Sequence, residues 1–119
     1  MGNSLRLRLR QAEVRRLLVD GAIEEVTTFG PAIEHRLSYT LYVSATQSGV
    51  NASFVECRII IRVPASVVQE WASTDQVSIH GRQHAGEDTE LRILIEKDFE
   101  CIDAPADESQ EDAFPNLQR

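Results

Sequence analysis

Three arginines near the start of the chain are the side chains most suited to binding an anion. Arg6, Arg8 and Arg10 alternate with leucines, so a strand here would present all three on one face. Guanidinium groups bind phosphates and carboxylates through paired hydrogen bonds. The row therefore predicts a site for an anionic ligand, an acidic partner or a nucleic acid. The alternative is a solvated strand face whose arginines pair with acids on a neighbouring strand.

A second group of candidate residues lies near the end of the last predicted strand. Glu96 and Asp98 share one side if that strand continues, and Cys101 follows shortly after. Clustered carboxylates can bind a divalent cation or serve in acid and base catalysis, and a thiolate beside a base can act as a nucleophile. The spacing matches no metal-ligand motif, so the alternative is an ordinary charged strand edge. Cys57 and Cys101 are expected to be reduced, buried thiols.

The remaining sequence contains little that is typical of catalysis. His80 and His84 have the spacing of a helical metal pair, but Gly81 and strand-forming neighbours argue against a helix, so both are expected on the surface. There is no Gly-x-Ser-x-Gly elbow, Walker loop, Cys-x-x-Cys pair or dinucleotide fingerprint. We therefore expect no metal and no cofactor, and the balance is against an enzyme.

Local patterns predict the elements that position these residues. Strand-like alternation or composition covers residues 5–9, 22–29, 37–43, 57–63, 77–79 and 91–99. Helical spacing of apolar residues predicts short helices over 11–20 and 65–75. Residues 46–51 and 81–88 have the composition of turns and loops. The expected core includes Leu7, Leu17, Tyr39, Ile61, Trp71 and Ile93.

The element order reads βαββ twice, and a shift of 54 residues superposes residues 5–43 on 59–97 without a gap. Ile23, for example, meets Val77 under this shift. One such unit cannot cover its own apolar face, so two should pack together. The sequence thus predicts an α+β fold of duplicated βαββ units, forming a six-stranded, mainly antiparallel sheet or half-open barrel with two short helices.

Length and charge separate one domain from an acidic tail. The 119 residues carry a net charge of −7, and residues 100–119 hold six acids and one arginine. We expect a single domain over 1–103 and an acidic tail over 104–119, in which the segment 113–116 with Phe114 docks on a groove. The tail's acids would then lie against the Arg row.

The chain is expected in the cytoplasm, because it has no secretion signal and no apolar run long enough to span a membrane. The acidity argues against general nucleic-acid binding.

Several segments of the chain resemble a small bacterial family described as a domain of unknown function. They span nearly the whole sequence, and the more specific ones are the first and the last. The resemblance implies a shared fold and a bacterial, cytosolic setting, and brings no activity or site residues with it. The segments are Gly2-Asn3-Ser4-Leu5-Arg6-Leu7-Arg8-Leu9, Glu13-Val14, Glu24-Glu25, Thr28-Phe29, Trp71, Asp75-Gln76-Val77, Glu96-Lys97-Asp98-Phe99, Cys101 and Ala113-Phe114-Pro115-Asn116.

These observations favour a non-catalytic binding or interaction module with a protein partner or a second copy of itself. One alternative is a small enzyme or divalent-metal protein that uses Glu96, Asp98 and Cys101. The other is an anionic-ligand or nucleic-acid binder that uses the row of Arg6, Arg8 and Arg10.

Overall fold

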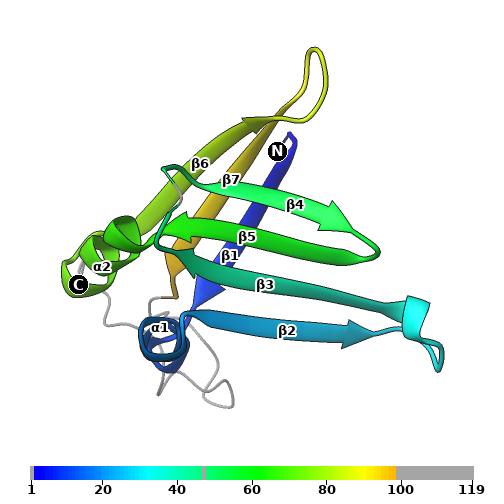
Figure 1. The fold of residues 1–119 in the computed structure, drawn as a ribbon, viewed down its shortest axis with the longest axis horizontal. Coiled ribbons are helices and arrows are strands. Elements are labelled where there is room, and N and C mark those ends of the chain that lie inside the picture. The colour runs from blue at the N-terminus through cyan, green and yellow to red at the C-terminus, as the bar shows by residue number, and fades with distance from the viewer. Residues whose placement is uncertain (1, 47, 99–119) are drawn as a thin grey trace, which may run out of the picture.

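Seven strands and two α-helices build the described part of the domain (Figure 1). The computed structural model describes residues 2–46 and 48–98. Neither helix of this described part is long and apolar enough to span a bilayer. The elements are β1 (Ser4–Leu9), α1 (Gln11–Asp20), β2 (Ala22–Thr28), the 3-10 turn η1 (Ile33–His35), β3 (Arg36–Ser44), β4 (Asn51–Val55), β5 (Arg58–Pro64), α2 (Ala65–Ser73), β6 (Ser78–His84) and β7 (Glu90–Lys97).

The strands form two mixed sheets. Sheet A has the order β1-β7-β6, and sheet B has the order β2-β3-β5-β4. In sheet A, β1 runs parallel to β7, and in sheet B, β5 runs parallel to β3. The other three neighbouring pairs are antiparallel. Each parallel pair joins strands that are distant in sequence, so the fold depends on long-range contacts.

The two sheets diverge from the end of the molecule that carries both helices (Figure 1). Each helix connects one sheet to the other, since α1 follows β1 and precedes β2, and α2 follows β5 and precedes β6. The core lies where the sheets and helices meet. Its buried apolar residues are Leu9, Val14, Leu17, Ile23, Leu41, Ile61, Val63, Val68, Trp71, Ile79, Ile93 and Ile95.

Local chemistry explains where α1 begins and ends. The Glu13 carboxylate accepts the backbone N–H of Arg10 at 3.0 Å, which satisfies a donor just before the first turn. Gly21 ends the helix in the left-handed conformation (φ 79°), and its N–H donates to the Leu17 carbonyl at 2.9 Å. The sequence predicted both boundaries of this helix.

The predicted α+β class and the two short helices are confirmed, whereas the prediction of six strands in one mainly antiparallel sheet or half-open barrel is wrong. The described strands number seven and form two mixed sheets that do not close into a barrel. The additional strand is β4, which pairs with β5. Two further boundaries differ, because β6 continues through His84 and β7 ends at Lys97.

Contacts between the two sheets explain why β4 forms where the local sequence gave no signal. The side-chain amide of Gln83 in β6 accepts the N–H of Ala52 and donates to its carbonyl, both at 2.7 Å. Beside it, Gly81 leaves room for Val50, since a Cβ at position 81 would lie 2.7 Å from the Val50 side chain. Gly81 therefore belongs to the strand and not to a loop, and Gln83 joins the edge of sheet B to sheet A.

The gapless alignment of the two halves is wrong by two residues in one strand. Ile23 lies opposite Leu41, whereas Ile79, not Val77, lies opposite Ile95. Only Gly21 separates α1 from β2, but residues 74–77 separate α2 from β6. The loop between β6 and β7 is shorter than the loop between β2 and β3, which restores the 54-residue shift in β7. Because β6 is offset, Ile79 is buried at the position predicted for Val77, and Val77 is 44% exposed.

Most expected core residues are buried, but three expectations fail. Leu17, Ile61, Trp71 and Ile93 are buried, whereas Leu7 and Tyr39 are only half-buried because the sheets diverge above them. Cys57 was expected to be a buried strand residue and is instead an exposed thiol in a turn. Cys101 and the predicted tail, 104–119, lie outside the described residues.

The turn that exposes Cys57 stores backbone strain. Glu56 and Cys57 have φ values of 51° and 62° and join β4 to β5 in a two-residue hairpin. Two-residue turns of this kind favour Asn-Gly, because most other residues are less stable in the left-handed region. We expect Glu56→Asn with Cys57→Gly to raise the free energy of unfolding by about 1 to 2 kcal/mol. Chemical denaturation would measure the gain. Cys57→Ser is the control, and an equal gain from it would contradict the strain argument.

Candidate functional site

The outer face of sheet A gathers four arginines from three strands. Strand register places these side chains on one side of the sheet, opposite the buried residues of β6 and β7. Two glutamates and two histidines share the face with them. We call this surface the arginine face, and it comprises Arg6, Arg8, His80, Arg82, His84, Glu90, Arg92, Leu94 and Glu96.

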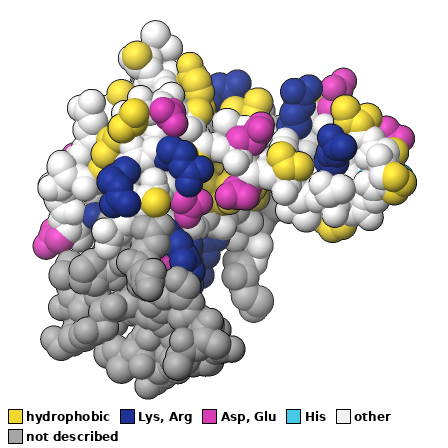
Figure 2. Space-filling view, turned by 90° about the horizontal axis from the view of Figure 1, so that it is seen from below, with side chains coloured by type: hydrophobic (Ala, Val, Ile, Leu, Met, Phe, Trp, Pro, Cys, Tyr) yellow, Lys and Arg dark blue, Asp and Glu magenta, His cyan; other side chains and the backbone are white. Residues whose placement is uncertain are grey.

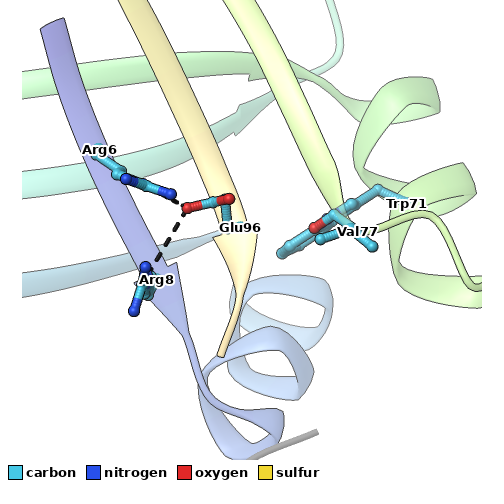
Figure 3. A network of polar contacts seen from close by, with 5 residues as sticks. All are labelled: Arg6, Arg8, Trp71, Val77 and Glu96. Atoms are coloured by element: carbon cyan, nitrogen blue, oxygen red, sulfur yellow. Dashed lines mark hydrogen bonds and ion pairs between the residues drawn. The ribbon is translucent and has the colours of Figure 1, made fainter. Parts of the chain in front are cut away.

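At one corner of this face, two arginines share a single carboxylate (Figure 3). Arg6 Nε donates to Glu96 Oε1 at 2.6 Å, and Arg8 Nε lies 3.7 Å from the same oxygen. Glu96 is 16% exposed, whereas the Arg6 and Arg8 side chains are 56% and 60% exposed. The carboxylate is therefore largely enclosed, and the two cations remain open to solvent.

The enclosed geometry shifts the titration of both partners. The hydrogen bond from Arg6 lowers the pKa of Glu96, and the charges of Arg6, Arg8 and His80 act in the same direction while burial opposes them. The same hydrogen bond raises the pKa of Arg6. Glu96 is therefore held as a carboxylate, which does not suit it to act as a proton donor.

The shift of Glu96 predicts how the stability depends on pH. Because the folded-state pKa lies below the unfolded value of about 4.3, the stabilisation by Glu96 is complete above that value. It is lost as the pH falls through the folded-state pKa. In denaturation curves collected at stepwise lower pH, Glu96→Gln should flatten the acid limb of the stability profile. Glu70→Gln, on the exposed face of α2, should leave the limb unchanged, and equal slopes in all three proteins would contradict the assignment.

A second pair of arginines shares a carboxylate at the other end of the face. Arg82 and Arg92 lie directly opposite each other on β6 and β7. Their Nε atoms are 3.8 and 3.7 Å from Glu90 Oε1, and their side chains are 70% and 68% exposed. Like charges on facing positions disfavour the pairing unless an acid lies between them. The arginine face thus repeats one motif, two arginines that share one glutamate.

Arg10, the third arginine of the predicted row, directly follows β1. Arg10 Nε is 3.8 Å from Asp98 Oδ2, and the Arg10 side chain is 40% exposed, which is less than predicted. A hollow of about 210 Å³ lies beside this pair and is lined by Arg8, Val77, Glu96, Lys97 and Asp98. Its volume is below the range of about 300 to 1,000 Å³ typical of small-molecule sites.

Contacts on the inner side of β7 hold Glu96 in place. Val77 O accepts both the Trp71 Nε1–H at 2.9 Å and the Lys97 backbone N–H at 3.1 Å (Figure 3 shows Trp71 and Val77). Lys97 is buried, its Nζ donates to the Thr74 carbonyl at 2.7 Å, and it lies 5.8 Å from the centre of the Trp71 ring. Burial lowers the pKa of Lys97, and Asp75 opposes this shift. The end of β7 is therefore anchored to α2.

The structure unites two groups that the sequence treated separately. Arg6, Arg8 and Arg10 and the carboxylates of Glu96 and Asp98 form one network, because β1 lies beside β7. Ion pairing with a neighbouring strand, the alternative given for the Arg row, is what these contacts show. Cys101 and Phe114 lie outside the described residues.

The site also includes two histidines that the sequence singled out and three charged residues that it did not. His80 and His84 are exposed on β6, as predicted. In the described part of the chain, no group of three or more metal-ligating side chains could hold a metal ion. Sequence reasoning missed Arg82, Glu90 and Arg92, because only the β6–β7 register brings them onto this face.

The fold and this surface define a small α+β domain with an open, arginine-rich sheet face. The chain belongs to a family described as a family of unknown function (DUF7009), whose model matches residues 1–118. No curated protein and no solved structure matches the chain.

Proposed function

We propose that the domain is a non-catalytic interaction module whose arginine face binds an acidic segment of another polypeptide. The observation that carries this proposal is the double Arg-Glu-Arg motif on one open face. Each glutamate is shared by two arginines, so the four arginines exceed the two acids by two charges. All four side chains are more than half exposed.

The geometry of one hydrogen bond and three ion pairs supports recognition of carboxylates. In each motif the arginine contacts its glutamate through Nε, and a guanidinium has further N–H donors on its terminal nitrogens. Those donors suit a second carboxylate, because Arg and carboxylate pair in a planar, charge-assisted way. The shared glutamates also hold the arginine side chains in place before binding, which reduces the entropy lost on association.

The shape and charge of the surface favour a polypeptide over other anionic ligands. The nearby hollow is small, and the arginines are spread over three strands, so the surface suits an extended partner better than a small molecule. The chain has a net charge of −7, which repels a long, uniformly charged polyanion such as a nucleic acid. An acidic peptide carries fewer charges and can match the limited area of the face.

Fluorescence anisotropy with a labelled peptide that alternates glutamate and serine tests this function. The double changes Arg6→Gln with Arg8→Gln and Arg82→Gln with Arg92→Gln should each weaken binding about tenfold, and salt should weaken the wild type. Arg15→Gln with Arg16→Gln, two exposed arginines on α1, is the charge-matched control and should retain the affinity. Equal losses in all three variants, or tighter binding of duplex DNA than of the peptide, would contradict the proposal.

The chain's own acidic tail would compete for the same surface. Residues 100–119 carry six acids and one arginine, and the sequence predicts that these acids lie against the Arg row. Neutralising Asp107, Glu108, Glu111 and Asp112 to their amides should leave the affinity for the external peptide unchanged if the face is open. A gain in affinity would show that the tail occupies it.

We also propose that the two halves of the domain descend from one duplicated βαββ unit. The registers of the parallel pairs support this, since Leu5 lies opposite Ile93, and Ile59 lies opposite Tyr39. Adding 54 to Leu5 gives Ile59, and adding 54 to Tyr39 gives Ile93, so the two pairs are equivalent. In this interpretation β4 is an addition between the halves.

A further inference from the structure

We propose that the free edge of β2 binds an extended, basic peptide by β-strand addition. This edge belongs to sheet B and is distinct from the arginine face, so the inference does not rest on the function proposed above. A cleft of about 670 Å³ extends over the face of sheet B as far as β2, and its lining includes three glutamates, two apolar side chains and two arginines. Backbone hydrogen bonds would provide affinity, and the cleft would select the side chains.

The hydrogen-bond pattern shows which backbone groups of β2 point outward. At the two ends of the β2–β3 ladder, Phe29 N–H donates to His35 O, and Val43 N–H donates to Gly21 O. Because antiparallel pairing alternates along a strand, Ile23, Glu25 and Thr27 bond to β3. The N–H and C=O groups of Glu24, Val26 and Thr28 therefore face outward, and within the described residues they have no protein partner.

The charges of Glu24 and Glu25 protect this edge against pairing with its own kind, but other common protections of an edge strand are missing. It has seven residues, with no proline, no lysine and no bulge in its pairing with β3. Five consecutive residues, 24–28, are exposed. Figure 2 views the molecule from the side of β2 and shows acidic side chains along the middle of that face, and hydrophobic side chains with basic and acidic ones among them at its far end. Among the described residues, no other strand pairs with the outward edge of residues 24–28, so an added strand could pair there.

The cleft on the face of sheet B reaches β2, so it can receive side chains that the added strand projects to this face. Glu24 and Val26 line it from β2, together with Ile33 and Glu34 of η1. Val26 and Ile33 are 51% and 76% exposed, so both present apolar surface to the cleft. The other lining residues are Arg36, Ser38, Glu56, Cys57 and Arg58. An apolar side chain of the peptide would cover Val26 and Ile33.

The charges around β2 select a basic partner. Glu24 and Glu25 project from opposite faces of the strand, and neither Glu25 nor Glu34 has an ion-pair partner among the described residues. Within the described residues, the Glu24 carboxylate accepts one side-chain hydrogen bond, from the Thr40 hydroxyl at 3.3 Å. On the inner face, Glu25 and Glu13 both lie near Tyr39, whose pKa is raised by burial and then by these two carboxylates.

The same charges argue against the two other occupants of the edge. A second copy paired through β2 would bring Glu24 and Glu25 against their own counterparts, and like charges on facing positions destabilise a sheet. The chain's own acidic tail would be repelled by these carboxylates. Arg36 lines the cleft near the far end of β2, while Arg58 lies 3.5 Å from Glu56. The balance at the edge therefore stays acidic.

Amide hydrogen exchange of the full chain with a peptide that alternates lysine and valine tests the inference. In the protein alone, the amides of Glu24, Val26 and Thr28 should exchange rapidly while those of Glu25 and Thr27 are protected. Saturating peptide should protect all five. Protection of the outward amides before peptide is added, or concentration-dependent dimers, would show that the tail or a second copy occupies the edge and would overturn the proposal.

Variants of the edge separate backbone pairing from charge. Val26→Pro removes an outward N–H that the β2–β3 ladder does not use, so the fold should persist while peptide affinity falls about tenfold. If that variant does not fold, Glu24→Lys with Glu25→Lys replaces it and should also weaken binding about tenfold. Glu70→Lys with Glu87→Lys makes the same charge change at exposed positions elsewhere and should retain affinity. Unchanged binding in the edge variants would overturn the proposal, as would equal binding of an acidic peptide.

Discussion

Replacing Trp71 with alanine is expected to lower the free energy of unfolding by about 3 to 5 kcal/mol, a large part of the stability of a domain of this size. Trp71 is fully buried in α2, where it contacts the core formed by both sheets. Its removal would leave a cavity, the Val77 carbonyl without its indole donor, and Lys97 without the ring beside it. Equilibrium denaturation by urea would measure the loss.

Two further variants separate the contributions of Trp71. Trp71→Phe keeps most of the apolar contact and loses the hydrogen bond to Val77, so its cost should be smaller than that of Trp71→Ala. Phe54→Ala removes an aromatic ring that is 65% exposed and should cost little. If Trp71→Ala unfolds with the same midpoint as Phe54→Ala, Trp71 does not hold the core together.

The second large effect concerns the junction between the two sheets. Gln83→Ala removes both hydrogen bonds to the backbone of Ala52 and should cost about 2 kcal/mol, or roughly 1 kcal/mol for each bond. The loss should be local at first, so the amide of Ala52 should exchange faster than those in the centre of β5. Gln83 is part-buried in this contact, and within the described residues these two hydrogen bonds are the ones that join the β4 backbone to sheet A.

Gln69→Ala is the matched control for this change, because Gln69 is exposed on α2 and its side chain makes no hydrogen bond in the described part of the chain. It should leave stability and the exchange of Ala52 unchanged. If Gln83→Ala and Gln69→Ala behave alike, the two sheets are held together by the core alone.

Local signals in the sequence predicted the elements whose stability is local. The α1 helix has an acid in its first turn and Gly21 at its end, and the strands of both halves alternate clearly. Strand β4 carries no such signal, because it is stabilised by pairing with β5 and by Gln83, which lies 31 residues away from Ala52. The shift between Val77 and Ile79 was also hidden, because both residues are apolar and alternate in the same phase.

The candidate site was predictable only in part, for a similar reason. Alternation alone placed Arg6 and Arg8 on one strand face. Their shared partner Glu96 lies 90 residues from Arg6, and only the parallel pairing of β1 with β7 brings the three together. Arg82 and Arg92 join the face through the β6–β7 hairpin, whose register the sequence did not define.

The most direct test of the arginine face is to observe its guanidinium groups while an acidic peptide is added. In NMR spectra of the full-length protein, the Nε–H signals of Arg6, Arg8, Arg82 and Arg92 should move together and saturate at one peptide concentration. Those of Arg15 and Arg16 on α1 should not move. Shifts confined to arginines outside the face, or no saturable shift at all, would contradict the proposal that this domain binds acidic partners through sheet A.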